Sequence, residues 1–285
     1  MQGFTVFRTV SDITGNGIVS IYPDGTTRIV ATEKPIFHEA GWERAGECDT
    51  VPRSKKVRDA DSSPSARAVH RAVSSIRDIV LCNSWDWWVT LTIAPDSMDD
   101  GWRYDYDAQQ KKIRILLDNM VRRKGLRYIL IPELHQDGAI HYHGFFGGGI
   151  KAKWSGTMQS PSGGKPVRVK SVDRKRLVAE GWREVYNLPD WTLGFSTAIA
   201  PYGDRLGAAR YACKYATKML CEGKKIGGRY YLSGGELCRE PEKHVIQIDT
   251  TGLVEQGFWC GDMDFGGGRI FAKWTGVNSD ETFTI

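Results

Sequence analysis

Two histidines one residue apart, His141 and His143, lie in the segment IPELHQDGAIHYHGFFGG at residues 131–148. A carboxylate, Glu133, and a third histidine, His135, precede them. Side chains alternate between the two faces of a β-strand, so the first pair shares a face, and so does the second. Such a group could bind a divalent metal ion. Histidines that alternate on a strand by chance are the simpler explanation.

The loop between the two strands decides which of these side chains meet. A three-residue loop at 136–138, ending on a left-handed glycine, places Glu133 directly opposite His141 and brings all three ligands to one face. A two-residue loop instead places Leu134 opposite His141, and the polar side chains then lie on different faces. In the three-residue register His135 lies one step nearer the turn, so we rank it below Glu133.

Two imidazoles and one carboxylate suit a borderline divalent ion such as Mn²⁺, and they also accept Mg²⁺, Co²⁺, Ni²⁺ or Zn²⁺. Three protein ligands leave coordination positions open for a substrate, so the site could be catalytic. If the loop has three residues, we expect His141, His143 and Glu133 to hold a divalent ion, with Mg²⁺ or Mn²⁺ as our choice among these.

The segment YACKYATK supplies a second set of reactive groups. Tyr211 and Tyr215 are four residues apart, so on a helix they lie on one face, and Lys214 and Lys218 each follow a tyrosine by three residues. A phenol is mostly protonated at neutral pH, but a nearby metal and lysines favour the phenolate. Such tyrosines could cut and rejoin a nucleic-acid strand through a phosphotyrosine. Tyrosines that only pack a half-buried helix against a sheet are the structural alternative.

The surrounding pattern predicts the elements that position these residues. Residues 17–33 predict a hairpin around the turn at 23–25, and residues 43–65 a polar, basic connection. The further elements are a helix with Ser63 as N-cap over 63–82, a strand at 85–95 ended by Pro95, a helix at 106–124 closed by Gly125, a glycine-rich loop at 147–166, a helix at 173–187, a strand at 191–201, a helix at 204–223, and strands at 227–235 and 243–251.

This order of elements predicts an α+β fold with a central antiparallel sheet and flanking helices. The composition of the chain limits which partners and which cellular compartment are expected. The chain has 285 residues, a net charge of +5 and basic residues clustered between Lys151 and Arg229, which is compatible with a nucleic-acid partner without proving one. The six cysteines form no CxxC pair, and no signal peptide or membrane-spanning run is present. We expect a cytoplasmic protein with no membrane partner.

Three motifs in one order resemble the HUH endonucleases, specifically the two-tyrosine rolling-circle replication initiators of small single-stranded DNA phages and related plasmids. They are WVTLTIAP at 88–95, HYH at 141–143 and YACKYATK at 211–218. The segment GGRYYLSGGEL, from residue 227, is also similar to one that often follows that helix in the phage initiators. The resemblance covers roughly residues 85–240.

The resemblance implies a five-stranded antiparallel sheet, the HUH or ferredoxin-like palm, with the histidines on a central strand and the tyrosine helix against them. It implies attack on a DNA phosphate that leaves a 5′-phosphotyrosine and a free 3′-hydroxyl. The implied metal ligands are His141, His143 and Glu133; the implied nucleophiles are Tyr211 and Tyr215, and the assisting cations are Lys214 and Lys218. The implied partners are single-stranded origin DNA and a host helicase and polymerase, since no GxxxxGK[ST] stretch occurs.

The expected domains are residues 1–65, a β-rich extension and basic linker; 66–250, the endonuclease domain; and 251–285, a C-terminal extension. Two features depart from the family pattern. The spacers Ala212, Cys213, Ala216 and Thr217 are smaller or more polar than the usual branched residues, and the insert from Gly147 to Lys170 is long.

Other functions share part of these features. A conjugative relaxase normally carries its tyrosines before the histidines, and a small transposase usually has one tyrosine and a shorter chain. A non-haem iron oxygenase also uses two histidines and a carboxylate, but leaves the tyrosine helix unexplained. A DNA-binding module with a structural metal is the remaining alternative, and metal-dependent nicking of single-stranded DNA separates it from a nuclease.

Overall fold

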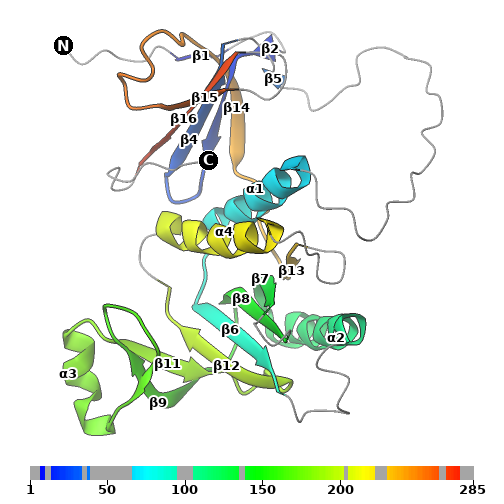
Figure 1. Cartoon of the computed structure of the whole chain (residues 1–285), viewed down its shortest axis with the longest axis vertical. Coiled ribbons are helices and arrows are strands. Elements are labelled where there is room, and N and C mark those ends of the chain that lie inside the picture. Colours follow the sequence, from blue (N-terminus) through cyan, green and yellow to red (C-terminus); the bar gives the residue numbers. More distant parts are fainter. Residues whose placement is uncertain are drawn as a thin grey trace. The chain divides into compact units, whose positions relative to one another are not determined.

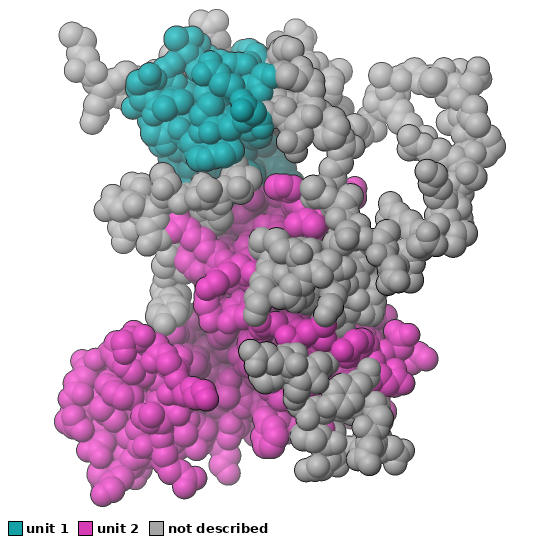
Figure 2. All heavy atoms as spheres, in the orientation of Figure 1, with its two compact units in different colours: residues 1–58, 241–285 teal, residues 59–240 magenta. Residues whose placement is uncertain are grey.

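The chain forms two compact units, one from residues 1–58 and 241–285 and the other from residues 59–240 (Figure 2). The computed structural model describes residues 7–9, 14–33, 37–38, 66–94, 105–134, 139–201, 205–221, 230–262 and 268–276. The predicted domain limits at residues 65 and 250 stay predictions. The predicted connection at 43–65, with the N-cap Ser63, and the strand-ending Pro95 lie outside the described residues.

The larger unit is built on an eight-stranded sheet in the order β10-β9-β11-β12-β6-β8-β7-β13, in which all neighbours are antiparallel. The strands are β6 (Trp87–Ile93), β7 (Arg127–Leu134), β8 (Ile140–Gly147), β9 (Lys153–Gln159), β10 (Val167–Arg168), β11 (Arg183–Asn187), β12 (Gly194–Ile199) and β13 (Leu232–Gly234). The predicted α+β class with an antiparallel sheet is confirmed.

Four α-helices accompany this sheet in the described part of the chain: α1 (Ala66–Cys82), α2 (Tyr106–Lys124), α3 (Arg174–Ala179) and α4 (Arg205–Cys221), with a short 3₁₀ turn η3 (Ser171–Asp173) before α3. The end of α2 at Gly125 is as predicted, and Asp105 provides an N-cap that was not predicted. Asp105 caps its first turn by accepting a hydrogen bond from the Ala108 amide, and Gly125 ends it in the left-handed conformation at φ 63°.

The two faces of the sheet are covered by different helices (Figure 1). On one face, Val89, Leu91 and Ile93 of β6 are fully buried in a core that includes Ile113 and Leu117 of α2. On the other face, α4 contacts β7 and β8 and packs along α1. Alternation along β6 therefore sends every second side chain into the α2 core and the others toward the α1–α4 face.

The sheet is larger than the predicted five strands, and two local predictions were wrong. Residues 153–159 were expected in a glycine-rich loop and form β9, while residues 183–187 were expected in a helix and form β11. These strands pair with each other despite Gly156, which has φ 79°, and a register shift after Val185 interrupts the alternation that marks a strand. Only the helix α3 remains of the predicted helix at 173–187.

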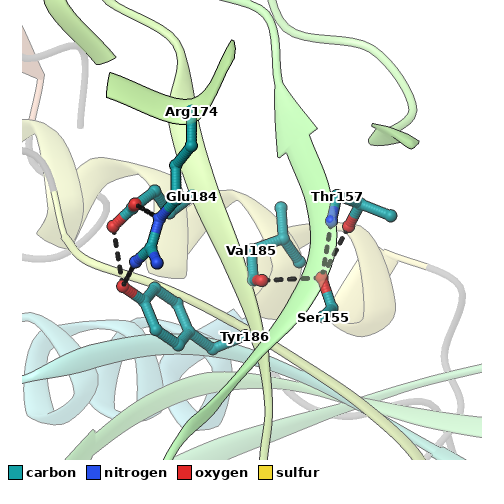
Figure 3. A network of polar contacts seen from close by, with 6 residues as sticks. All are labelled: Ser155, Thr157, Arg174, Glu184, Val185 and Tyr186. Carbon is teal, nitrogen blue, oxygen red and sulfur yellow. Dashed lines mark hydrogen bonds and ion pairs between the residues drawn. The ribbon is translucent and has the colours of Figure 1, made fainter. Parts of the chain in front are cut away.

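Polar contacts stabilise this extension of the sheet (Figure 3). The guanidinium of Arg174 pairs with Glu184, and the Tyr186 hydroxyl donates a hydrogen bond to the second oxygen of that carboxylate at 2.7 Å. Ser155 bridges β9 to β11 by donating to the Val185 carbonyl at 2.6 Å. The Arg174 partner holds the pKa of Glu184 below its ordinary value, so the carboxylate stays charged at neutral pH.

The smaller unit joins both ends of the chain in one antiparallel sheet, ordered β1-β14-β3-β4-β16-β15. Its strands are β1 (Phe7–Thr9), β3 (Gly17–Ile21), β4 (Thr27–Thr32), β14 (Glu242–Ile248), β15 (Trp259–Asp262) and β16 (Arg269–Thr275), and β2 (Thr14–Gly15) pairs separately with β5 (Phe37–His38). The predicted hairpin of β3 and β4 is confirmed. Among the described helices, none is long and apolar enough to cross a membrane.

Candidate functional site

The predicted ligands lie on neighbouring strands at the centre of the larger sheet. Glu133 of β7 pairs directly with His141 of β8, and His143 lies two residues further along β8 on the same face. This is the register expected from the three-residue loop. The loop at 135–138, including His135, lies outside the described residues.

Each histidine also faces a threonine on its other side. In the pairing of β6 with β8, Thr92 lies opposite His141 and Thr90 lies opposite His143. The Thr92 hydroxyl lies 3.0 Å from Nδ1 of His141, and the Thr90 hydroxyl lies 3.1 Å from Nδ1 of His143. These bonds fix both ring orientations and leave Nε2 as the second nitrogen of each ring. On His143 that atom lies 2.9 Å from Glu133 Oε2.

The threonines were not predicted as site residues, although a signal for them was present. The spacing Thr-x-Thr in WVTLTIAP equals the spacing His-x-His in the hairpin. In an antiparallel pair, two such motifs can lie opposite each other residue for residue. Their roles therefore follow from the register between β6 and β8, which sequence spacing alone does not give.

Tyr142, between the two histidines, points into the opposite face. It is fully buried in the α2 core, and Gln110 of α2 donates a hydrogen bond to its hydroxyl at 3.1 Å. Burial raises the pKa of this phenol well above its ordinary value. The middle residue of the HYH motif thus anchors β8 to α2, while its two neighbours are presented on the other face.

The tyrosine helix α4 lies against the histidine face. Tyr215 stacks on the His143 ring with centroids 4.3 Å apart, and the hydroxyls of Tyr211 and Tyr215 are 2.9 Å apart. Trp88 of β6 packs against both tyrosines, with ring centroids 4.8 Å from Tyr211 and 5.9 Å from Tyr215. Helix and sheet therefore bring both phenols to the group formed by Glu133 and His143.

Small residues allow α4 to approach its neighbours closely. Ala209 and Ala212 are fully buried, and Cys213 is buried with its thiol 3.7 Å from the Val73 carbonyl of α1. Burial raises the pKa of the Cys213 thiol to about 11, so this residue is no competing nucleophile at neutral pH. The departure from branched spacers noted in the sequence is thus explained at Ala212 and Cys213 by packing.

The two phenols differ in environment. Tyr211 is 46% exposed, whereas Tyr215 is partly buried between His143 and Trp88. Burial raises the pKa of Tyr215 well above its ordinary value, and the hydrogen bond with Tyr211 and the negative charge of Glu133 act in the same direction. The groups described around Tyr215 therefore favour the neutral phenol.

The structure describes the side chain of only one of the two predicted lysines. Lys214 is exposed on α4, next to Tyr215 in the chain. Lys218 lies in the same helix, but its side chain is outside the described part of the structure. Within the described ranges, no group of three His, Cys, Asp or Glu side chains is arranged as a ready metal site. The contact of His143 with Glu133 is the nearest approach to one among the predicted ligands.

Comparison with known proteins places this site in a family. Residues 86–220, just under half of the chain, match the family model of the replication-associated protein ORF2. The segment belongs to the replication-associated protein ORF2 family. Members of this ORF2 family are rolling-circle replication initiators of single-stranded DNA phages, as the sequence motifs predict. Neither a curated protein nor a solved structure matches the chain.

The matched region contains every residue of the site. It runs from just before β6 to the end of α4, so it includes both threonines, Glu133, both histidines and both tyrosines. Membership in the ORF2 family implies a replication initiator that binds origin DNA. The six-stranded sheet of the smaller unit lies outside the match.

Proposed function

We propose that this ORF2-family protein nicks single-stranded origin DNA by tyrosine attack on a phosphodiester and later rejoins the strands in rolling-circle replication. The observation that carries the proposal is the stacking of Tyr215 on His143 at 4.3 Å, while the same imidazole contacts Glu133 at 2.9 Å. The proposed nucleophile Tyr215 and two of the proposed metal ligands thus lie on one face. This arrangement supports the HUH palm architecture that the motifs imply.

Two imidazoles and one carboxylate are donor types that a divalent ion accepts. Two of these three donors, on His143 and Glu133, lie together in the structure. The distance between His143 Nε2 and Glu133 Oε2 is 2.9 Å. Nδ1 of each histidine is already held by a threonine hydroxyl, which is the orienting bond that metal-binding imidazoles commonly make. We propose that His141, His143 and Glu133 hold Mg²⁺ or Mn²⁺.

Bound there, the ion would supply the positive charge that favours a phenolate and offsets charge on the phosphate. The chain's own groups then orient the reaction. The phenol loses its proton, its oxygen forms a bond to phosphorus, and the bond from phosphorus to the 3′ oxygen breaks. The products are a 5′-phosphotyrosine and a 3′-hydroxyl, whose oxygen takes up a proton. Lys214 and Lys218 are proposed to offset charge on the phosphate.

Rejoining reverses the same steps. A DNA 3′-hydroxyl attacks the phosphotyrosine, the bond to the phenol oxygen breaks, and tyrosine is released. Because the two hydroxyls lie 2.9 Å apart, either phenol can reach nearly the same position over the histidines. We propose that one tyrosine holds the first 5′ end while the other makes the second cut. Duplex unwinding and synthesis would come from a host helicase and polymerase.

Labelled single-stranded origin fragments test this function. The protein is incubated with Mn²⁺ and the pooled fragments, and a covalent protein–DNA band is sought on a denaturing gel. We expect a band that disappears in excess EDTA and in His141→Ala and His143→Ala variants that keep the wild-type fold. A band that persists undiminished in excess EDTA overturns the metal role. Binding without any adduct favours the non-catalytic DNA-binding alternative.

A further inference from the structure

A large aromatic side chain lies in the same cross-strand row as the histidine site. Phe195 of β12 pairs with Thr92 of β6, Thr92 pairs with His141 of β8, and His141 pairs with Glu133 of β7. Directly paired residues project from the same face. With strands about 4.8 Å apart, Phe195 lies two strands, or about 10 Å, from His141.

Phe195 is 69% exposed, unlike the other aromatic residues of this face of the sheet. Its chain neighbour Ser196, on the opposite face, is buried, so the strand is not exposed as a whole. Single exposed apolar residues are common on proteins. The position of Phe195, in the row of Thr92 and His141, is therefore the observation that matters.

The backbone beneath Phe195 is held tightly. A Cβ at Gly194 would lie 2.3 Å from the Thr92 carbonyl oxygen, so only glycine permits this approach of β12 to β6. The Trp191 indole donates a hydrogen bond to the same oxygen at 3.3 Å, and the Ala94 amide donates to the Leu193 carbonyl at 3.0 Å. Phe195 thus projects from a fixed strand.

The same face continues toward β11 and β9, which extend away from α1 and α4 (Figure 1). Tyr186 pairs with Ala198 on the α2 face, so the next residue of β11, Asn187, projects from the Phe195 face, and it pairs with Lys153 of β9. Both Asn187 and Lys153 are exposed. An exposed aromatic ring followed by a polar and a cationic side chain is the combination that binds single-stranded nucleic acid by stacking and phosphate contact.

We infer that Phe195 is a base-stacking positioning residue, and that single-stranded DNA runs from the histidine site across β12 toward Lys153. The inference rests on the proposed function for its substrate class. A flat ring of this kind accepts the face of any base, and the base must be unpaired to reach it. Phe195 would therefore select single-stranded over duplex DNA and hold the strand next to the reacting phosphate.

Binding measured without cleavage tests this. Oligothymidylates carrying one 2-aminopurine are titrated with protein in EDTA. We expect Phe195→Ala to weaken affinity by about 5- to 150-fold, the range that corresponds to the loss of one stacked base. Phe195→Trp should retain wild-type affinity and 2-aminopurine quenching, whereas Phe195→Leu, which keeps an apolar side chain and the fold, should lose both. Ile115→Ala is the control, because Ile115 is 63% exposed on α2, the helix of the opposite face.

A series of oligonucleotides, each with one abasic nucleotide at a different position, separates the loss of stacking from a general loss of structure. In the wild type, one abasic position should weaken binding, and in Phe195→Ala the same position should have no further effect. Equal affinity of wild type and Phe195→Ala overturns the inference, as does an abasic penalty that survives in Phe195→Ala. If no covalent adduct forms in the nicking assay but these effects are present, the proposed chemistry fails and the stacking role stands.

Discussion

The ring of Tyr215 stacks on the imidazole of His143, with the centroids 4.3 Å apart and the planes inclined by 23°. The contact joins residues 72 positions apart in the chain, one on α4 and one on β8. It depends on the packing of α4 against β7 and β8. Because the same imidazole contacts Glu133, displacement of the helix would separate the proposed nucleophiles from the proposed metal ligands.

The two tyrosines should substitute for each other in part. The distance of 2.9 Å between their hydroxyls places both within reach of one phosphate. We expect Tyr211→Phe and Tyr215→Phe each to retain some nicking of labelled single-stranded DNA and the double variant to form no covalent adduct. Adducts are counted on denaturing gels, and joining is followed by ligated product.

One outcome of that experiment contradicts alternation. If Tyr215→Phe cuts and joins like the wild type while Tyr211→Phe is inactive, the more exposed tyrosine is the only nucleophile. Tyr215 would then serve to pack α4 on His143. The family assignment of residues 86–220 would be unaffected.

Packing beneath the tyrosine helix should control activity. Ala212 is fully buried on α4, so Ala212→Leu introduces a side chain without space and should lower the free energy of unfolding by about 1–3 kcal/mol. The molecules that remain folded should form less covalent adduct than the wild type, because their phenols move away from His143. Ala208→Leu on the same helix is the control, since Ala208 is only half-buried. Unchanged nicking by folded Ala212→Leu would show that the helix position is not critical.

The ion pair of Arg174 with Glu184 should make the β9–β11 extension sensitive to acid. The pKa of Glu184 is lowered in the folded protein by Arg174, so its stabilising contribution is complete above the ordinary pKa of a glutamate, about 4.3. It is lost as the pH falls through the lowered folded-state value. Glu184→Gln should therefore speed hydrogen exchange in β9 and β11 at neutral pH and make little difference in acid below that range.

Glu180→Gln provides the matched control for Glu184. Glu180 pairs with Arg176 at 2.7 Å on α3, but both side chains are about half exposed, and such pairs contribute little. Equal exchange rates for wild type and Glu184→Gln at neutral pH would mean that the contacts in Figure 3 do not stabilise the extension.

The parts of the fold that were predictable depend on local signals. The helix α2 has Asp105 and Gly125 at its ends, and the register of Glu133 with His141 follows from the length of one short loop. The helix end at Gly125 could be derived and the register could be narrowed to two alternatives, because each depends on residues close in the chain. The resemblance to replication initiators was also recognisable from the sequence, because each family motif is a short contiguous pattern.

The parts that were missed depend on contacts between distant residues. Asn16 donates a hydrogen bond to the Ile248 carbonyl at 2.8 Å and thereby helps to join the two ends of the chain in one sheet. No local sequence pattern predicts a pairing between residues so far apart in the chain. In β9, Gly156 and the neighbouring glycines resemble a loop, and pairing with β11 overrides that tendency. The threonine partners of the histidines likewise become visible only in the register of β6 with β8.

Those threonines should act as positioning residues for the proposed metal ligands His141 and His143. Thr90→Val keeps the shape of the side chain and removes the hydroxyl that lies 3.1 Å from His143 Nδ1. Loss of such an orienting bond commonly costs about 10- to 100-fold in metal affinity or activity. We therefore expect the Mn²⁺ concentration for half-maximal adduct formation to rise by about 10- to 100-fold. Activity should be recovered at higher Mn²⁺.

Two further variants separate this role from a general effect on the strand. Thr90→Ser restores a hydroxyl and should recover most of the wild-type Mn²⁺ dependence. Thr197→Val removes a hydroxyl from the next strand, β12, where Thr197 pairs with Thr90 and lies one strand further from the imidazole. It should leave the Mn²⁺ dependence unchanged. If Thr90→Val and Thr197→Val titrate with Mn²⁺ alike, the hydroxyl does not orient His143, and the imidazole must be held by its other neighbours, Glu133 and Tyr215.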